Sequence, residues 1–138
     1  MMPTQLIPQL TTVLAVLVCL AAMWRGDRPT RLIGGLVLFG WLLTPTTRQA
    51  GGVVLVLALD LALLVAMVWV SARWRRLWIA TAAACHLIAT ASHVARLLDP
   101  SLSGYIYITS LGLWSLGVIV LLLLAITVWR PVTPAISG

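Results

Sequence analysis

The chain has 138 residues, of which 62% are hydrophobic and only 9% are charged, and its mean hydropathy is +1.09. Soluble domains carry about 25% charged residues, so this composition excludes a water-soluble fold and indicates an integral membrane protein. The net charge of +6 comes from arginines in short loops between apolar segments. That placement indicates a membrane topology and contact with anionic lipid, and it argues against nucleic acid as a partner.

Five apolar segments predict an all-α fold, a polytopic bundle of transmembrane helices in a single domain. The predicted helices cover residues 6–24, 32–47, 51–70, 77–98 and 105–129. A helix needs about 20 apolar residues to cross a bilayer, and the last three segments meet that length. The first nearly meets it and is expected to be retained, since no basic residue precedes it as in a signal peptide.

The second segment, residues 32–47, is the doubtful span. At 1.5 Å per residue it forms a helix only about 24 Å long, which is short against a hydrocarbon core of about 30 Å. Pro45, with threonines around it, predicts the end of this helix. The bundle therefore has five spans, or four if residues 32–47 do not cross.

The distribution of arginine favours five spans. In that topology seven arginines lie on one side of the membrane and two on the other, whereas four spans give five against four. The seven are Arg25, Arg28, Arg31, Arg73, Arg75, Arg76 and Arg130, and the two are Arg48 and Arg96. Because basic loops are retained in the cytoplasm, the sequence predicts an N-terminus outside and a cytoplasmic C-terminus.

A basic and aromatic tract joins the third and fourth segments. It contains Arg73, Trp74, Arg75, Arg76 and Trp78. Tryptophan favours the membrane boundary because its ring is apolar and its N–H seeks water. We interpret the tract as a lipid-facing anchor on anionic lipid at the cytoplasmic face, with docking of another membrane protein subunit as the alternative.

Asp60 stands alone in the middle of the apolar run from Gly51 to Val70. An ionised carboxylate at that depth is costly and is usually paired, neutralised or functional. His86, on the next segment, falls at a similar depth in an antiparallel hairpin, so an intramembrane pair of Asp60 and His86 is expected. The pair is either a structural clasp or a proton-relay site, and Thr81 or Thr90 are alternative partners of the acid.

A second polar group is predicted nearer the outer surface. His93 lies one heptad after His86, and Arg96 and Asp99 follow within two turns. Proline disfavours helix in the residue before it, so Asp99 should end the fourth helix. His93, Arg96, Asp99 and Tyr105 could together form an outer polar cluster.

Cofactor and catalytic signals are weak. Alanine four residues before each of His86 and His93 leaves room for haem or chlorin, but two histidines on one helix face cannot clamp one iron from opposite sides. Cys19 and Cys85 lie in apolar runs without metal-ligand spacing. We therefore expect no metal and no cofactor. No catalytic motif is present, so an enzyme is not predicted.

Several short stretches resemble a known group of proteins. They are DLALL from Asp60, RWRRLW from Arg73, HVARLLDP from His93, YIY from Tyr105 and WS from Trp114. Together they resemble uncharacterised small multi-pass inner-membrane proteins of alphaproteobacteria. The resemblance covers about half of the chain and implies a bacterial inner-membrane location, but it carries over no function.

Three functions remain open at this stage. The leading hypothesis is an accessory or scaffold subunit of a larger membrane assembly, with other membrane protein subunits as partners. The first alternative is a small proton-coupled transporter or channel component that uses Asp60 and His86. The second is a haem- or pigment-binding membrane subunit that uses His86 or His93.

Overall fold

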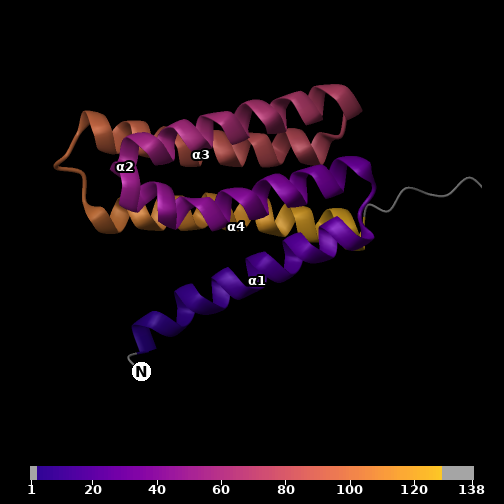
Figure 1. The fold of residues 1–138 in the computed structure, drawn as a ribbon, viewed down its shortest axis with the longest axis horizontal. Coiled ribbons are helices and arrows are strands. Elements are labelled where there is room, and N and C mark those ends of the chain that lie inside the picture. Colours follow the sequence, from indigo (N-terminus) through magenta and orange to yellow (C-terminus); the bar gives the residue numbers. More distant parts are fainter. Residues whose placement is uncertain (1–2, 129–138) are drawn as a thin grey trace, which may run out of the picture.

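The computed structural model describes residues 3–128, and describes side chains for residues 10–47 and 49–128. Every regular element in this part of the chain is a helix, so the all-α prediction is confirmed. In chain order the elements are α1 (Pro3–Arg25), α2 (Arg28–Trp74), α3 (Leu77–Leu98) and α4 (Gly104–Thr127). Figure 1 shows α2, α3 and α4 packed lengthwise as a bundle, with α1 leaning away toward its N-terminal end.

The long element α2 reverses direction at Gly52. This residue has φ 61° and ψ −150°, a conformation that is accessible to glycine and strained for residues with a Cβ. Residues 28–51 and 53–74 are therefore two helical arms, which run antiparallel in Figure 1. The reversal lies where the sequence predicts the boundary between the second and third helices.

The prediction that Pro45 ends a helix is wrong, because the first arm of α2 continues through it. Proline removes one backbone N–H and so leaves a carbonyl one turn earlier without its usual donor. Threonine hydroxyls bond to neighbouring carbonyls in this stretch: Thr44 Oγ1 donates to Gly40 O at 2.7 Å, and Thr47 Oγ1 donates to Leu43 O at 3.1 Å. The affected carbonyl is that of Trp41, four residues before Pro45, so these bonds add to the backbone bonds of this stretch and do not replace the missing one.

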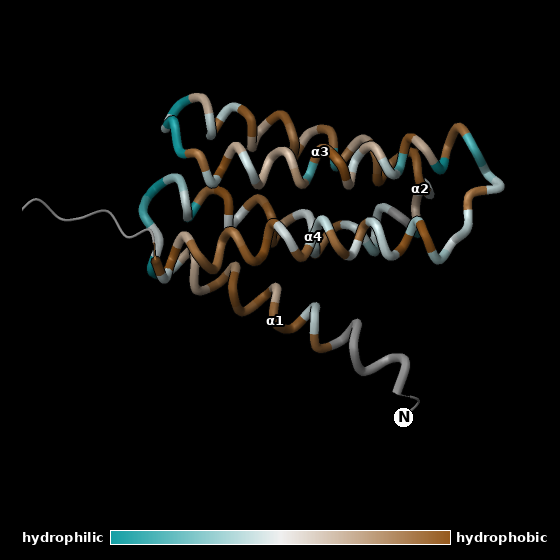
Figure 2. Tube along the Cα trace, turned by 180° about the vertical axis from the view of Figure 1, so that it is seen from behind, coloured by the Kyte–Doolittle hydropathy of each residue, from teal (hydrophilic) through white to brown (hydrophobic). Residues whose placement is uncertain are grey.

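Three helices are long and apolar enough to cross a membrane. They are Gln49–Trp74, Leu77–Leu98 and Gly104–Thr127, and Leu10–Arg25 is a shorter apolar helix. The coarse prediction of a transmembrane helical protein is thus supported by three of the five segments, and residues 28–47 are not among them. Figure 2 shows the corresponding pattern, brown along the helices with teal gathered at the turns.

One end of the bundle is strongly basic and is held together by an ion pair. Arg76, which precedes α3, contacts Asp27, which precedes α2, with Nη2 and Oδ2 3.2 Å apart. Asp27 also caps α2, because its Oδ1 accepts from the Thr30 backbone N–H at 3.2 Å. The turn before α2 and the turn before α3 therefore meet at this basic end, which holds Arg25, Arg28, Arg31, Arg73, Arg75 and Arg76.

The core is densest toward the basic end. Ile33, Met67, Ile79 and Leu122 have almost no exposed surface and come from α2, α3 and α4. α3 buries Ala82, Ala83 and Ala89 among its neighbours, and such small side chains let helix backbones approach closely in lipid. The other end of the bundle, where α3 turns into α4, is less tightly filled and contains the candidate site.

Candidate functional site

Asp60 lies on the second arm of α2 and faces the interior of the bundle. Only 9% of the residue is exposed. It is eight residues beyond Gly52 and fourteen before the end of α2, so it sits about 12 Å from the reversal and 21 Å from the basic end. Its neighbours in sequence, Leu59 and Leu61, are apolar, so its polar partners come from other helices.

The main partner of Asp60 is His93 of α3. Oδ2 of the carboxylate lies 2.9 Å from Nε2 of the imidazole, a distance typical of a charge-assisted hydrogen bond. His93 is only 5% exposed, so the pair is largely shielded from its surroundings. An acidic side chain at this depth is costly to leave unpaired, and the contact with His93 gives it a partner.

Tyr107 of α4 extends the pair to a third helix. Its hydroxyl oxygen lies 2.6 Å from Nδ1 of His93, and the two rings meet edge to face with centroids 5.5 Å apart. If Asp60 is ionised and His93 neutral, Nε2 carries the hydrogen toward Asp60 and Nδ1 accepts from the Tyr107 hydroxyl. Protonation of His93 turns Nδ1 into a donor, so the Tyr107–His93 bond must reverse.

His86 lies against the backbone of Asp60 rather than against its carboxylate. Its Nε2 is 3.1 Å from the Asp60 carbonyl oxygen and 4.0 Å from Oδ1. The expected proximity of Asp60 and His86 is therefore present, but the shorter contact to the carboxylate belongs to His93. Thr90, one of the alternative partners, instead donates from Oγ1 to the carbonyl of His86 at 2.9 Å.

The tilt of side chains explains why His93 is the partner. Helical side chains lean toward the N-terminus of their own helix. The second arm of α2 and α3 are antiparallel, so Asp60 leans toward the reversal at Gly52 while the α3 histidines lean toward the basic end. His93, about 24 Å from the start of α3, begins slightly beyond Asp60 and leans back to meet it. His86, about 14 Å from the start of α3, is already nearer the basic end than Asp60 and leans further from the carboxylate.

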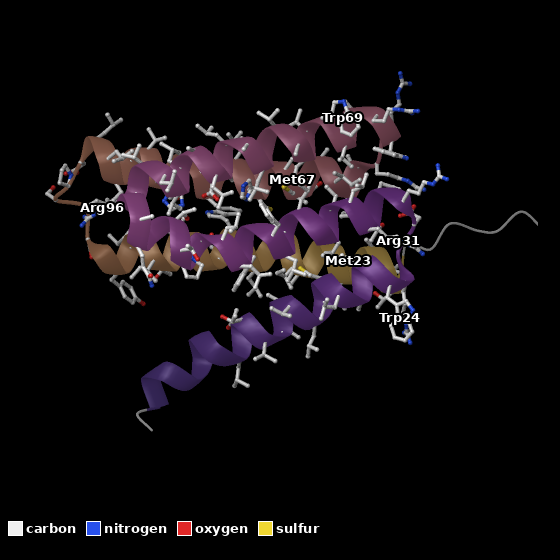
Figure 3. All side chains as sticks on the ribbon, viewed as in Figure 1. Met23, Trp24, Arg31, Met67, Trp69 and Arg96 are labelled. Atoms are coloured by element: carbon white, nitrogen blue, oxygen red, sulfur yellow. The ribbon has the colours of Figure 1, made fainter. Side chains whose placement is uncertain are left out.

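A cavity of about 740 Å³ borders this chain of polar side chains. All four helical elements contribute to its wall, and Asp60, His86, His93 and Tyr107 are among the lining residues. Figure 3 shows Arg96 at one end of the bundle and Met67 nearer the basic end, and both side chains line the cavity. Titratable groups on a cavity wall between apolar helices are typical of ligand, ion or proton pathways.

The residues of the predicted outer cluster are separated in the structure. His93 turns inward to Asp60, while the half-buried Arg96 donates from Nη1 to the carbonyls of Pro100, at 2.9 Å, and Leu102. Tyr105 is 79% exposed. Asp99 accepts from the backbone N–H of Ser101 at 2.9 Å and from its hydroxyl. These Ser101 bonds, together with the Arg96 charge, hold the pKa of Asp99 below its usual value.

The residues of the predicted anchor tract also differ in their surroundings. Trp74 is half-buried, packs edge to face against Trp69 at 6.0 Å and lies beside the guanidinium carbon of Arg73 at 5.6 Å. Arg75 adopts a left-handed conformation with φ 51° and ends α2. Trp78, in contrast, is only 8% exposed and belongs to the core. It is the second residue of α3 and lies on the face of this helix that packs inward.

Tyr107 is the site residue that sequence reasoning missed. It lies two residues after Tyr105, on the opposite side of a helix that begins at Gly104. The signal was present in its position: α4 starts beside the end of α3, so a residue in the first turn of α4 falls level with the last turns of α3. His93 is in that part of α3.

The described residues contain no group of three or more histidine, cysteine or acidic side chains able to hold a metal ion. Both ring nitrogens of His93 contact protein groups, and Nε2 of His86 contacts the Asp60 carbonyl. An iron atom would have to displace one of these contacts. Cys19 and Cys85 are both free thiols.

Comparisons with known proteins add no family. No family model matches the chain, and neither a curated protein nor a solved structure matches it significantly. What the fold and the site define is therefore a class, a helical protein with apolar helices long enough to span a membrane.

Proposed function

We propose that the chain crosses the bacterial inner membrane five times, with its N-terminus outside and its C-terminus in the cytoplasm. α1, with 23 residues, and the first arm of α2, residues 28–51, are as long as α3, with 22 residues, and α4, with 24. In Figure 1 the first arm of α2 lies in the bundle, and α1 leans away from it toward its N-terminal end. A basic end that contains six arginines and one aspartate supports the cytoplasmic assignment.

We further propose that the protein is a small proton-coupled carrier. The observation behind this function is that the Asp60–His93 pair, although largely buried, contributes to the wall of a cavity. The carboxylate, the imidazole and the Tyr107 hydroxyl form a continuous chain along which a proton can pass by exchange of hydrogen bonds. An occupant of the cavity changes the electric field at this pair, so ligand and proton occupancy are coupled.

The carrier ranks above the accessory subunit and the haem-binding subunit. A pair that only clasps two helices is expected to be enclosed by packed side chains, and the same pair on a cavity wall has access to an occupant. Haem binding has less support because the imidazole nitrogens of His93 both face protein partners. No particular contact among the described residues supports a role in a larger assembly.

Proton uptake into proteoliposomes tests the carrier. The purified protein is reconstituted into vesicles of bacterial polar lipid that enclose a pH-sensitive dye, and a potassium diffusion potential drives protons inward. We expect Asp60→Asn to lower the rate to that of protein-free vesicles, because the amide keeps the shape of the acid but cannot carry its proton. Asp99→Asn is the matched control and should behave as wild type. Equal rates for Asp60→Asn and wild type would contradict the proposal.

A further inference from the structure

The cavity has a polar end and an apolar end. Near the turn between α3 and α4 its wall includes Arg96 and Tyr107 beside apolar residues such as Val53 and Ile108, and toward the basic end it includes Leu63, Met67 and Ile119. Figure 2 shows the same change in hydropathy along α4, which is paler in its first half and brown in its second. The polarity of the wall therefore changes along the axis of the bundle.

That gradient parallels one leaflet of a bilayer. In the proposed orientation, the turn between α3 and α4 lies at the outer interface, and the apolar end of the cavity lies near the middle of the membrane. α1 contributes Thr11, Thr12 and Leu14 to the wall, in the part of α1 that leans away from the bundle in Figures 1 and 2. A molecule oriented like a lipid of the outer leaflet would place its polar head at the polar end of the cavity and its apolar chain at the apolar end.

The charges of the wall select the head of that molecule. The Asp60 carboxylate contacts the Nε2 donor of His93, so a cationic head placed beside it would compete with His93. At the polar end, carbonyls of the α3–α4 turn hold Arg96 through Nη1. Asp99 of the same turn interacts electrostatically with Arg96 but is not among the residues that line the cavity, so Arg96 is the charged group that this end presents to an occupant. A cationic head is repelled there, whereas a carboxylate or phosphate forms charge-assisted bonds with arginine.

We propose that the cavity binds an amphiphile with an anionic head, placed with the head at Arg96 and Tyr107 and the apolar chain toward Met67. This inference names the substrate class of the carrier and so rests on the proposed function. It also links the two activities, since Tyr107 lines the cavity and contacts His93. The side chains that contact His93 are Asp60 from α2 and Tyr107 from α4.

Gly112 provides a way to fill the cavity without disturbing the helices. It lines the cavity, and a Cβ built on it meets no atom within 4 Å. Gly35 of α2 has the same open surroundings but is not among the cavity-lining residues. Gly112→Leu and Gly35→Leu are therefore matched variants, which add the same side chain inside and outside the cavity.

Ligand binding is measured in nanodiscs of zwitterionic lipid with a fluorescent fatty acid as the probe and its methyl ester as the uncharged comparison. We expect the acid to bind, the ester to bind at least tenfold more weakly, and Arg96→Gln to remove most of that difference. Gly112→Leu should lower the affinity for the acid about tenfold or more, and Gly35→Leu should leave it unchanged. Displacement of the probe by lysophosphatidic acid or by an unlabelled fatty acid then distinguishes a phosphate head from a carboxylate.

Equal affinities for the acid and the ester, or unchanged binding in Gly112→Leu, would overturn the inference. The assay uses no proton gradient, so its outcome is independent of the flux assay. Proton flux that depends on Asp60, without binding of the acid, would remove the ligand class and keep the carrier. Binding of the acid without Asp60-dependent proton flux would keep the ligand class and remove the carrier.

Discussion

His93 Nε2 lies 2.9 Å from Asp60 Oδ2, and this contact joins α3 to the second arm of α2. A neutral imidazole that also contacts Tyr107 can donate to the carboxylate only through Nε2. The position of the proton on this pair therefore sets the direction of its hydrogen bonds, and the pair also holds α3 against the second arm of α2.

The Asp60–His93 contact should contribute to the stability of the bundle. We expect His93→Leu to lower the free energy of unfolding in micelles by about 1–3 kcal/mol, because a buried carboxylate loses its donor. Asp60→Leu combined with His93→Leu should recover much of that loss, since no unpaired charge remains. Losses that simply add in the double variant would show that the two side chains do not act as a pair.

Gly52 should tolerate no side chain. Its φ of 61° and ψ of −150° are strained for any residue with a Cβ, so Gly52→Ala should destabilise the protein by roughly 1–3 kcal/mol. Gly35→Ala is the control, because its surroundings are open and its helical backbone favours alanine. Thermal unfolding in detergent measures both, and equal midpoints for the two variants would contradict the reversal at Gly52.

The proposed topology has a labelling test. With Cys19 and Cys85 replaced by alanine, Gln49→Cys and Ser101→Cys should react with a membrane-impermeant maleimide in intact spheroplasts. Arg75→Cys should react only after permeabilisation. Arg28→Cys, at the other end of residues 28–47, should also react only after permeabilisation. If residues 28–47 do not cross, Arg28→Cys and Gln49→Cys report the same side, and the five-span assignment is wrong.

The exposed turn after α3 should show a pH effect. The bonds from Ser101 hold the pKa of Asp99 below its usual value, so ionised Asp99 favours the folded turn above the pKa of the unfolded chain. That contribution is lost as the pH falls through the lower folded pKa. Ser101→Ala should raise the pKa of Asp99 toward its ordinary value in an NMR titration. No change on this substitution would rule out Ser101 as the cause.

Hydropathy and composition were enough to predict an all-helical membrane protein, because lipid allows few other ways to satisfy a backbone. They were not enough to place Pro45, because one proline removes a single backbone bond and the helix continues through it. Counting residues along a hairpin placed His86 level with Asp60, because the predicted third helix ended at Val70. α2 instead runs on to Trp74, which moves Asp60 about 6 Å further from the basic end and closer to the level of His93 than to that of His86.

The cavity was beyond prediction for a related reason. Its wall is assembled from all four helical elements, and a single sequence without a repeat or motif does not say which faces of those elements meet. Trp78 illustrates the same point. Tryptophan favours the membrane boundary, but at the second position of α3 this side chain faces the core.

The most direct test of the proton chain is Tyr107→Phe in the proteoliposome assay. This change removes the hydroxyl that contacts His93 Nδ1 at 2.6 Å and keeps the ring that packs against the imidazole. If the chain from Tyr107 through His93 to Asp60 carries protons, the variant should lose most of its proton uptake, while its stability falls by only about 1 kcal/mol. Wild-type uptake in a folded Tyr107→Phe protein would contradict the account.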